Sequence, residues 1–447
     1  MFRKILVANR GEIAVRIINT LKRLGIKSVA VYSEADKAAG FVQEADESYC
    51  IGESQIQKSY TNITSIINVA LKANVDAIHP GYGFLSESSE FAIACIKKGL
   101  TFIGPPADVI EKTSNKLVTK QLMNKMNVPV LAGSEEFLQD INHAKQVARK
   151  LGYPVMLKAN TGGGGIGLSV INNEEELERC FHENQQRADM YFGEKDLFLE
   201  KYIYHARHIE VQVACDQQGN AIHLFERECS VQRRYQKIVE ESPSPSISFD
   251  VKNNLIVTAL KATMEIGFQN VGTVEFILDE HMNFYFIGMN GRIQVEHTVT
   301  EETLGLDLVE MQIHIAAGLN LKYNQSDIKQ IGHAVECRLY AEDPVNYVPS
   351  PGKIKTLHIP SYEGVRLDIG VQVGDVITPF YDPLLGKIIT YGPTREHAIA
   401  TMCDILKNTQ IEGMKTNLPT LQTVIRDGNF TQGNYTTSVL KEEVTIR

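Results

Sequence analysis

The first hundred residues alternate short apolar runs with segments whose apolar positions recur every three or four residues. Residues 4–8 form a run typical of a buried strand, and Gly11 begins a segment with Ile13, Ile17 and Leu21 on one helical face. The alternation continues with expected strands at 28–32, 75–79 and 101–103 and expected helices at 63–71 and 90–98. Strands separated by helices predict parallel βαβ units, so we expect a doubly wound α/β domain over residues 1–113.

Two polar segments of this domain directly follow expected strands. Residues 9–11 come after the first strand, and residues 79–82, which read His-Pro-Gly-Tyr, come after another. In open sheets of this kind the functional loops lie at the carboxyl ends of the strands. Both segments are therefore placed where functional loops are expected.

The remaining chain divides into a mixed region and a strand-rich region. From about 114 to about 321 we expect a glutamate-rich helix at 174–178 and strands at 155–158, 168–171, 197–203, 208–213 and 222–225. Runs at 274–278 and 284–289 flank a short polar turn, which is the pattern of a β-hairpin. From about 332 to 440, strands with glycine and proline turns precede a helix at 396–407, so we expect an α+β C-terminal domain.

The composition supports three folded domains and excludes several classes of protein. The 447 residues correspond to three domains of about 150 residues each. Hydrophobic residues make up 43% of the chain, which excludes a disordered protein, and no run approaches the ~18 apolar residues of a membrane span. The net charge of −9 argues against nucleic acid as a partner. Seven scattered cysteines indicate reduced thiols, so we expect a cytoplasmic protein that does not associate with membranes.

A glycine run at residues 162–165 follows Lys158 and lies between two expected strands. The run lacks the ending of a P-loop, and no helix follows it, which excludes a dinucleotide-binding turn. Two readings stay open for the glycines: backbone N–H groups that lie over phosphates, or a surface loop without function. Two also stay open for Lys158: an ammonium group that binds phosphate, or a stem that packs on the strand while the charge reaches water.

The expected hairpin carries a carboxylate, Glu275, and ends in an amide, Asn290. Positions 288 and 290 share one face of their strand, because side chains alternate along a strand. Carboxylate and amide oxygens facing each other suit Mg²⁺, which takes its other ligands from phosphates and water. Two polar residues near a hairpin are also common on a plain surface, so the pair alone leaves both interpretations open.

The densest polar segment is 292–297, where polar and apolar residues alternate. As an extended strand it would place Arg292, Gln294 and Glu296 on one face. An arginine fork binds a small planar anion, and an adjacent carboxylate can serve as a general base. Further basic residues follow one another between 226 and 237, and a surface salt bridge is the alternative for each of these charges.

Four long motifs, taken together, are similar to those of one known family. They are Ala-Asn-Arg-Gly-Glu-Ile-Ala at 8–14, His-Pro-Gly-Tyr-Gly-Phe-Leu-Ser-Glu at 79–87, Arg-Ile-Gln-Val-Glu-His at 292–297 and His-Ala-Val-Glu-Cys-Arg at 333–338. In this order, over the whole chain, they resemble the biotin carboxylases, which are ATP-grasp ligases. The resemblance implies a doubly wound N-terminal domain at 1–113, a central ATP-grasp domain at 114–321 with a mobile lid at about 131–203, and a strand-rich C-terminal domain at 332–440.

The resemblance also implies an activity. In that family ATP phosphorylates bicarbonate, with Mg²⁺ (or Mn²⁺), and the resulting carboxyphosphate carboxylates biotin on a carrier protein. This is the first half-reaction of a biotin-dependent carboxylase such as the acetyl-CoA carboxylase of fatty acid biosynthesis. The implied partners are a biotin carboxyl carrier protein, carboxyltransferase subunits and a second copy of the chain as a homodimer. The three domains leave no residues for a biotinyl domain, and no Met-Lys-Met acceptor motif occurs, so we expect the biotin on another chain.

The resemblance assigns roles residue by residue. It implies ATP binding by Lys116, Lys158, Gly164, Gly165, Glu200, Lys201, Ile203, His208 and Tyr235. It implies a metal site at Glu275 and Asn290, a bicarbonate site at Lys237, Arg292, Gln294 and Val295, and a biotin site at Tyr82 and Arg338. Catalysis would fall to Arg292, Glu296, Lys237 and Arg338, with Glu296 as the base that deprotonates bicarbonate.

Two departures from the family pattern touch this site. Gly288 stands where the family has a metal-bridging glutamate, and Ile166 stands where a basic residue is expected in the glycine loop. We therefore expect ATP binding with slow turnover. Two alternatives stay open: another bicarbonate-using ATP-grasp ligase of the carbamoyl-phosphate type, which biotin-dependent ATPase activity would exclude, and a catalytically impaired regulatory or assembly subunit, which would bind Mg-ATP without turnover.

Overall fold

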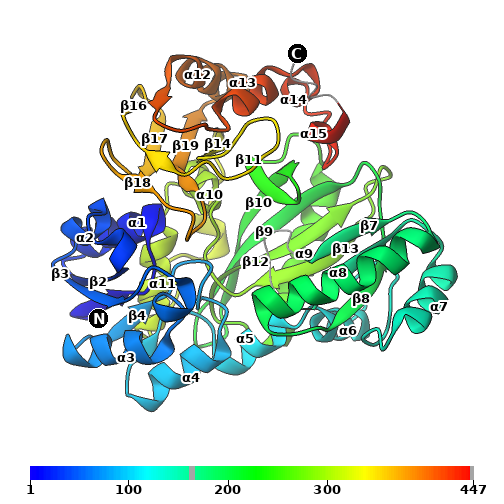
Figure 1. The fold of residues 1–447 in the computed structure, drawn as a ribbon, viewed down its shortest axis with the longest axis horizontal. Coiled ribbons are helices and arrows are strands. Elements are labelled where there is room, and N and C mark those ends of the chain that lie inside the picture. Colours follow the sequence, from blue (N-terminus) through cyan, green and yellow to red (C-terminus); the bar gives the residue numbers. More distant parts are fainter. Residues whose placement is uncertain (161–166, 443–447) are drawn as a thin grey trace.

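Three larger sheets organise the part of the chain that the computed structural model describes, residues 1–160 and 167–442 (Figure 1). A parallel sheet lies in the N-terminal part, a small antiparallel sheet in the central part, and a long antiparallel sheet joins the central and C-terminal parts. Short 3-10 helices occupy Glu34–Asp36, Ile56–Lys58 and Gln325–Asp327. Within the described ranges, no helix is both long enough and apolar enough to cross a membrane. The mixed α/β and α+β architecture agrees with the sequence prediction.

The N-terminal sheet is parallel throughout, as the alternation of strands and helices predicts. Its strands are β1 (Lys4–Val7), β2 (Lys27–Ser33), β3 (Glu47–Gly52), β4 (Ala77–His79) and β5 (Thr101–Phe102), in the order β3-β2-β1-β4-β5. Its helices are α1 (Gly11–Arg23), α2 (Gly40–Glu44), α3 (Ile63–Lys72), α4 (Ser89–Lys97) and α5 (Ala107–Ser114). Ile5, Leu6 and Val7 are all fully buried, because helices cover both faces of such a sheet and its strands must be apolar on both sides.

The strand order reverses between β1 and β4, and the two predicted functional segments meet at this point. The side-chain amide of Asn9 donates hydrogen bonds to the backbone oxygens of Pro80 (2.7 Å) and Tyr82 (2.8 Å). Gly81 has φ +64°, and a Cβ atom there would lie 2.9 Å from the Asn9 amide nitrogen. The loops after β1 and β4 are therefore held together at the carboxyl edge of the sheet.

A small antiparallel sheet with two helices forms the outer part of the central region. Its strands are β6 (Val155–Ala159), β7 (Leu168–Ile171) and β8 (Leu197–Lys201), in the order β7-β6-β8, with helices α7 (Ile141–Leu151) and α8 (Glu174–Phe192). The expected helix at 174–178 is much longer than predicted, because Leu177, Phe181 and Ala188 continue its buried face. Gly164, Gly165 and Ile166 lie outside the described residues.

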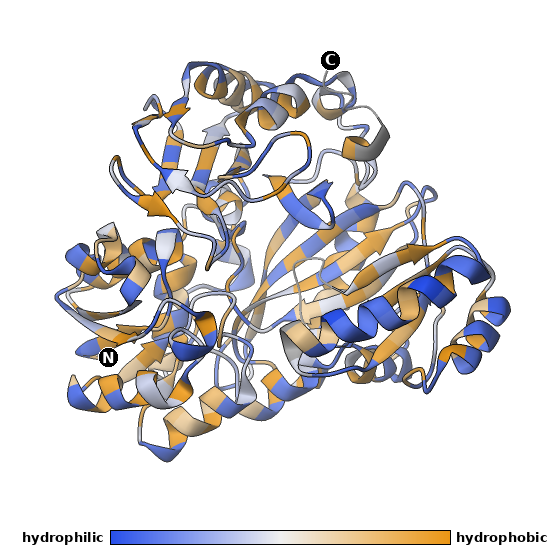
Figure 2. Ribbon diagram, viewed as in Figure 1, coloured by the Kyte–Doolittle hydropathy of each residue, from blue (hydrophilic) through white to orange (hydrophobic). Residues whose placement is uncertain are grey.

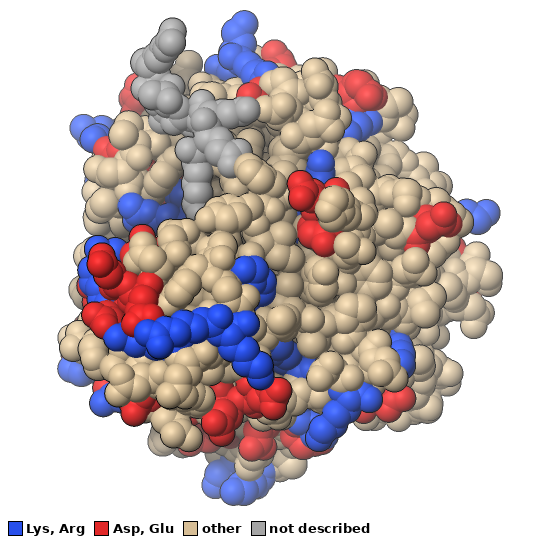
Figure 3. Space-filling view, turned by 90° about the vertical axis from the view of Figure 1, so that its right-hand side faces the viewer, with Lys and Arg blue, Asp and Glu red and all other residues tan. Residues whose placement is uncertain are grey.

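The outer surfaces of α7 and α8 are polar, and ion pairs join the two helices. Figure 2 shows long hydrophilic stretches on both. Arg149 contacts Glu174 at 2.7 Å, and Lys145 contacts Glu174 at 3.4 Å. On the face shown in Figure 3, acidic and basic side chains lie next to one another. Opposite charges on this face therefore stabilise the packing of neighbouring helices.

The eight-stranded sheet is the largest element of the fold. Its order is β13-β12-β9-β10-β11-β14-β19-β17. The strands are β9 (Arg207–Cys215), β10 (Ala221–Arg233), β11 (Gln236–Ser242), β12 (Asn270–Leu278), β13 (Phe284–Asn290), β14 (His333–Tyr340), β17 (Val365–Ile369) and β19 (Leu384–Gly392). The helices around it are α6 (Lys116–Lys125), α9 (Phe249–Ile266), α10 (His297–Leu304) and α11 (Leu308–Ala316). Because β11 pairs with β14, one sheet continues from the central region into the C-terminal region.

Two strands of this sheet differ from their predictions. The expected strand at 222–225 extends as β10 to Arg233, because polar residues that resembled a charged surface run are buried in the sheet. The alternating strand at 208–213 is β9, and all its residues are buried, polar ones included. Arg234 and Tyr235 form the two-residue turn from β10 to β11, with φ +49° and +66°, the backbone conformation that tight hairpins require.

The C-terminal region adds helices and two short strand pairs to its strands of the eight-stranded sheet. It contains α12 (Arg395–Asn408), α13 (Leu418–Arg426), α14 (Gly428–Thr431) and α15 (Val439–Glu442), and the strand pairs β15 (Gly352–Lys353) with β18 (Val376–Ile377) and β16 (Thr356–His358) with β20 (Gln410–Glu412). The expected helix at 396–407 is α12. Its buried residues Ala398, Met402 and Ile405 pack in the core of this region.

Candidate active site

A cavity of about 770 Å³ lies where the eight-stranded sheet meets the loops of the N-terminal sheet. Residues predicted for the site that line it are Tyr82, Lys116, Lys158, Lys201, Ile203, His208, Tyr235, Lys237, Glu275, Asn290, Arg292, Gln294, Val295, Glu296 and Arg338. Glu200 lies directly behind the wall and contacts Lys158. Gly164 and Gly165 lie outside the described residues. The fold therefore brings together side chains that are far apart in the sequence and come from all three regions.

Three lysines lie at one end of the cavity, and two of them contact the carboxylate of Glu200. The oxygens of Glu200 lie 2.5 Å from Lys158 Nζ and 2.8 Å from Lys120 Nζ. Lys116 begins α6 beside them, and burial, followed by repulsion from Lys158, lowers the pKa of Lys116 to about 8. Lys158 and Lys120 share one carboxylate, which leaves an excess of positive charge at this end. This end is therefore suited to a polyphosphate, whose oxygens would favour the protonated form of Lys116.

The other residues predicted for the nucleotide use their side chains in different ways. Lys201 Nζ donates a hydrogen bond to the backbone oxygen of Gly152 at 2.7 Å, so this ammonium group already has an acceptor within the protein. Ile203 follows β8 and adds an apolar group to the wall. His208 lies 3.0 Å from the Gln232 amide through Nδ1 and 3.5 Å from Glu275 through Nε2. The imidazole is therefore oriented by its neighbours on both sides.

Lys237 is the centre of a cluster of carboxylates. Its Nζ lies 2.6 Å from Glu210, 2.8 Å from Glu275 and 2.6 Å from Glu296. Burial alone would lower the pKa of Lys237, but the three carboxylates outweigh burial and hold the pKa well above its ordinary value. Lys237 is therefore a fixed positive charge on the cavity wall.

Glu296 lies between two cations and is almost completely buried, with 2% of its surface exposed. Lys237 contacts one carboxylate oxygen at 2.6 Å, and Arg338 donates to the other at 2.9 Å. Burial acts to raise the pKa of Glu296, but Lys237, Arg338 and Arg227 outweigh it and hold the pKa below the usual range. The group is thus an ionised carboxylate that can accept a proton inside the cavity.

The segment from 291 to 296 is a loop, and the strand that its alternation predicts does not form. β13 ends at Asn290, and α10 begins at His297. Arg292 nevertheless reaches the cavity, because Glu87 holds its Nε at 3.0 Å and Asn290 accepts from Nη2 at 3.1 Å. Ion pairs and hydrogen bonds, and not the period of a strand, bring the polar side chains of this segment to one side.

Gln294 and Val295 are held from behind by buried cations. Arg227, with no exposed surface, donates to Gln294 Oε1 at 2.7 Å, and Lys387 donates to the backbone oxygen of Val295 at 2.6 Å. The further acceptors of Arg227 are Glu210 (2.6 Å), Gln212 (2.6 Å), Thr300 (2.9 Å) and Thr273 (3.2 Å). The loop that forms the cavity floor is thus anchored to buried charges of the sheet.

The hairpin of β12 and β13 forms as predicted, but its register does not place the two candidate metal ligands opposite each other. Glu275 lies directly opposite Gly288, whereas Asn290 lies opposite Thr273. A Cβ atom at Gly288 would meet one heavy atom within 4 Å, the Glu275 Oε2 at 3.7 Å. Glu275 and Asn290 offer the oxygen donors that Mg²⁺ prefers. Position 288 lies beside Glu275 and has room for a side chain, but glycine supplies no metal ligand.

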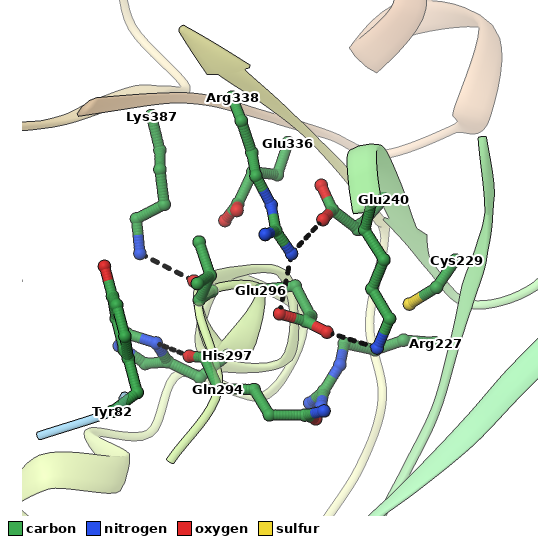
Figure 4. A network of polar contacts seen from close by, with 12 residues as sticks. Tyr82, Arg227, Cys229, Glu240, Gln294, Glu296, His297, Glu336, Arg338 and Lys387 are labelled. Carbon is green, nitrogen blue, oxygen red and sulfur yellow. Dashed lines mark hydrogen bonds and ion pairs between the residues drawn. The ribbon is translucent and has the colours of Figure 1, made fainter. Parts of the chain in front are cut away.

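Tyr82 reaches the network from the N-terminal sheet (Figure 4). Its hydroxyl donates to the buried carboxylate of Glu12, which also lies 3.4 Å from Lys387. Arg338 lies on another side of the same network, on β14. The predicted biotin residues therefore come from different regions and border one cavity.

Sequence reasoning missed a set of charged residues that support the site: Glu12, Glu87, Lys120, Glu210, Arg227, Glu240 and Lys387. Several of them are charged residues inside buried strands, as in β9, where Glu210 stands among apolar neighbours. A charge in a strand that is otherwise apolar could have been a signal, because burial of a charge requires a partner. The partner itself follows only from the pairing of strands.

Comparison with known families covers nearly the whole chain. Residues 1–110 match the biotin carboxylase N-terminal domain, residues 115–324 match the carbamoyl-phosphate synthase L chain ATP-binding domain, and residues 336–442 match the biotin carboxylase C-terminal domain. The chain belongs to the biotin carboxylase family. The four motifs predicted this family, its fold and its class of ATP-dependent ligases, and the comparisons confirm all three predictions.

Individual members of the biotin carboxylase family match over their full length. The chain is 51% identical to biotin carboxylase 2 of Bacillus subtilis (strain 168), over 99% of this chain and 100% of the relative. The biotin carboxylase–beta-gamma-ATP complex from Campylobacter jejuni has a TM-score of 0.95 at 43% identity and 99% coverage of both chains. The biotin carboxylase domain dimer of 2-oxoglutarate carboxylase from Hydrogenobacter thermophilus, in complex with MgADP, ADP and bicarbonate, has a TM-score of 0.97 at 46% identity, with 99% and 98% coverage.

Proposed function

We propose that this chain carboxylates biotin with bicarbonate at the expense of ATP, and that the biotin is carried by another protein. The observation that carries the proposal is the ionised Glu296 held between Lys237 and Arg338 inside the cavity. Family membership supports it, and so do the related structures that contain ADP, Mg²⁺ and bicarbonate. The comparisons give no support to a different ATP-grasp ligase or to a regulatory subunit.

Lys116, Lys158 and Lys120 bind and orient the phosphates of ATP. The excess positive charge at this end compensates negative charge that shifts during phosphoryl transfer, for which positioning and charge neutralisation are the main requirements. Glu200 keeps Lys158 and Lys120 in place through contacts of 2.5 and 2.8 Å. Gly164 and Gly165, which the resemblance assigns to ATP, remain predictions.

Glu275 and Asn290 would hold Mg²⁺, since both present hard oxygen donors at the cavity wall. When bound, the ion neutralises phosphate charge and orients the phosphates. Glu275 is ionised, because Lys237 and then His208 outweigh the effect of burial and hold its pKa well below the usual range. Glu275 is the carboxylate of the assigned pair and faces Gly288, so we expect a slower reaction than a carboxylate at position 288 would allow.

Arg292, Gln294, the backbone at Val295 and Lys237 form the site for bicarbonate, a small planar anion that suits an arginine fork and an ammonium group. Glu296 accepts the bicarbonate proton. Its proton affinity is low while Lys237 contacts it at 2.6 Å. An anion beside Lys237 competes for this ammonium group, so binding of the substrate raises the proton affinity of Glu296 at the moment it is needed.

Arg338 stabilises the negative charge that develops on the ureido group of biotin, and Tyr82 borders the ring from the opposite loop. Both residues line the cavity. Because biotin must enter on a separate chain, the partners are a biotin carrier and a carboxyltransferase, whose acyl acceptor is left open. A homodimer is supported by the dimeric Hydrogenobacter thermophilus structure.

Transfer of labelled bicarbonate to free biotin tests the proposal. The wild-type chain should form acid-labile labelled carboxybiotin with Mg-ATP and none without ATP. Glu296→Gln should abolish the product, whereas Glu178→Gln, an exposed carboxyl on α8, should leave it unchanged. Label on biotin that does not depend on ATP, or no label with wild-type protein that binds ATP, would contradict the proposal.

A further inference from the structure

Two carboxyl groups that no proposed role uses lie directly opposite each other behind Arg338. Glu240 on β11 and Glu336 on β14 are register partners in the antiparallel sheet. Both side chains are completely buried. Like charges at directly opposed positions repel each other, and burial removes the water that would screen them. Two ionised carboxylates in this arrangement need more positive charge than one residue supplies.

The cations near the pair are shared with other acids. Arg338 forms an ion pair with Glu240 through Nη2, and the same nitrogen donates to Glu296 at 2.9 Å. Figure 4 shows Glu240 and Glu336 on either side of the Arg338 side chain. Glu336 accepts a hydrogen bond from Thr298. Arg338 therefore cannot compensate Glu240 fully, and Glu336 relies on a neutral donor and a more distant lysine.

That lysine, Lys387 on β19, forms a hydrogen bond and ion pairs with other residues. It donates to the backbone oxygen of Val295 at 2.6 Å and lies 3.4 Å from Glu12 and 3.9 Å from Asp368. The titratable and charged groups that face the pair from all packed elements are Cys229 of β10, Lys237 of β11, Glu296 before α10, Cys337, Arg338 and Tyr340 of β14, and Lys387 of β19. Among them, Lys237 and Arg338 each contact other carboxylates of the site, and Lys387 donates to a backbone oxygen, so no cation is reserved for the pair.

We propose that Glu240 and Glu336 share one proton in the resting protein, and that Glu240 is a positioning residue that holds Arg338 toward Glu296. The inference rests on the proposed function for its kinetic consequence and on geometry alone for the shared proton. With one proton on the pair, a single negative charge orients the guanidinium group of Arg338. The positive charge of Arg338 is then only partly compensated and can attract the negative charge that develops on biotin. A second negative charge would hold Arg338 against its own carboxylates.

The expected titration of the pair follows from its surroundings. Burial is the largest cause for both groups and raises the pKa of Glu240 to about 7 and that of Glu336 to about 8. Arg338 lowers the pKa of Glu240, and Lys387 lowers that of Glu336, but neither overcomes burial. The two groups titrate as a pair, so the second charge appears as the pH rises through this range. Replacement of either carboxyl removes the repulsion, so the pKa of the remaining carboxyl falls.

Infrared spectroscopy of the protein without substrates tests the shared proton, through the carbonyl band of protonated carboxylic acids. We expect wild type at pH 6.5 to show a component that fades as the pH rises above 8. In Glu240→Gln and in Glu336→Gln this component should fade at a lower pH than in wild type. Glu241→Gln should retain it, because Glu241 is a buried neighbour on the same strand whose charge is fixed by Arg395 and His333. Spectra of both pair variants that match wild type would overturn the proposal, as would a wild-type band without a component that titrates in this range.

Kinetics with free biotin test the positioning role. In wild type, kcat/KM for biotin should fall several-fold as the pH rises from 7 to 9, and this fall should flatten in Glu336→Gln. Glu240→Gln should raise KM for biotin more than it lowers kcat for bicarbonate-dependent ATP hydrolysis, and Glu240→Asp should restore part of the loss. Equal loss of both activities in Glu240→Gln would overturn the positioning role. If neither wild type nor any variant carboxylates biotin while the infrared changes occur, the proposed function is wrong and the shared proton stands.

Discussion

The two large sheets both contain fully buried strand residues but differ in the kind of residue they bury. In the N-terminal parallel sheet, Ile5, Leu6 and Val7 have no exposed surface and are all apolar. In the eight-stranded sheet, Arg227 and Glu240 are just as inaccessible and carry charge. Apolar burial stabilises a fold directly, at about 25 cal/mol per Å². A buried ion pair contributes little net stability, because desolvation offsets the attraction between the charges.

This difference separates the scaffold from the reacting surface. The parallel sheet holds the loop of Tyr82 in place through Asn9 and contributes few groups to the chemistry. The eight-stranded sheet carries Lys237, Glu275 and Arg338 into the cavity, and each is held by other buried charges. A network of this kind is costly to form and rigid once formed, which suits a site that must aim charges at a transient species.

Removal of one charge from the eight-stranded sheet is the strongest test of this contrast. Glu296→Gln keeps the shape of the side chain and removes the proton acceptor. We expect bicarbonate-dependent ATP hydrolysis to fall by about 10²–10⁴-fold, the usual contribution of a general base. Binding of Mg-ATP and the circular dichroism spectrum should be unchanged. A rate within threefold of wild type would show that Glu296 is not the base.

Two substitutions of comparable cost to stability should separate the sheets. Leu6→Ala empties a fully buried position in the parallel sheet and should lower the free energy of unfolding by about 2–5 kcal/mol. Arg227→Met leaves the acceptors of a buried cation without their donor and should cost about 3–5 kcal/mol. Denaturant unfolding measures both effects.

The activities of these two variants should differ although their stabilities are similar. Under conditions where both are folded, Leu6→Ala should retain kcat/KM within about twofold, while Arg227→Met should lose most activity, because Gln294 and Glu210 lose their common donor. If both variants lose activity equally, the distinction between scaffold and reacting surface does not hold.

Position 288 offers a change in the opposite direction. Gly288→Glu would place a carboxylate beside Glu275 in space that is open. We expect bicarbonate-dependent ATP hydrolysis to rise about tenfold, which corresponds to ~1.4 kcal/mol of added stabilisation of the transition state. Gly288→Gln fills the same space without charge and should give little gain. Equal rates for wild type and Gly288→Glu would show that one carboxylate is sufficient.

The smallest effect should be the pH dependence of ATP binding at the lysine end. The pKa of Lys116 is lowered to about 8 by burial and then by Lys158, so this amino group loses its proton as the pH rises through 8. Bound phosphates favour the protonated form, and the affinity for ATP should therefore weaken several-fold between pH 8 and pH 9.5. Calorimetric titration would show this trend, and Lys116→Arg, which stays charged, should abolish it. A dissociation constant that does not vary over this range in wild type would contradict the assignment.

The sequence allowed strands β1, β2, β4 and β5 of the parallel sheet and helices α1, α3 and α4 to be predicted, because apolar runs mark these strands and glycines such as Gly25 mark where helices end. Strand β3 and helices α2 and α5 were missed, because β3 alternates polar and apolar residues and the two helices are short. Family resemblance allowed the charged residues Lys116, Lys158, Lys237, Glu275, Arg292, Glu296 and Arg338 of the cavity wall to be assigned. The hairpin that carries Glu275 was also predictable, because its turn is short and polar.

The supporting charges could not be predicted, because they depend on contacts between distant strands. Glu240 resembles an ordinary polar position until the register places it opposite Glu336. The loop at 291–296 looked like a strand, because alternation alone does not show that its polar side chains are held by Arg227 and Glu87. Register and ion-pair geometry are tertiary properties, and local patterns carry little information about them.

The most direct measurement for the central claim is the effect of free biotin on ATP hydrolysis by the wild-type chain in the presence of Mg²⁺ and bicarbonate. If Arg338 and Glu296 act on a common cavity in which carboxyl groups pass to biotin, saturating biotin should stimulate hydrolysis several-fold, and Arg338→Met should abolish the stimulation while it leaves binding of Mg-ATP intact. A rate of hydrolysis that is the same with and without biotin would contradict the account.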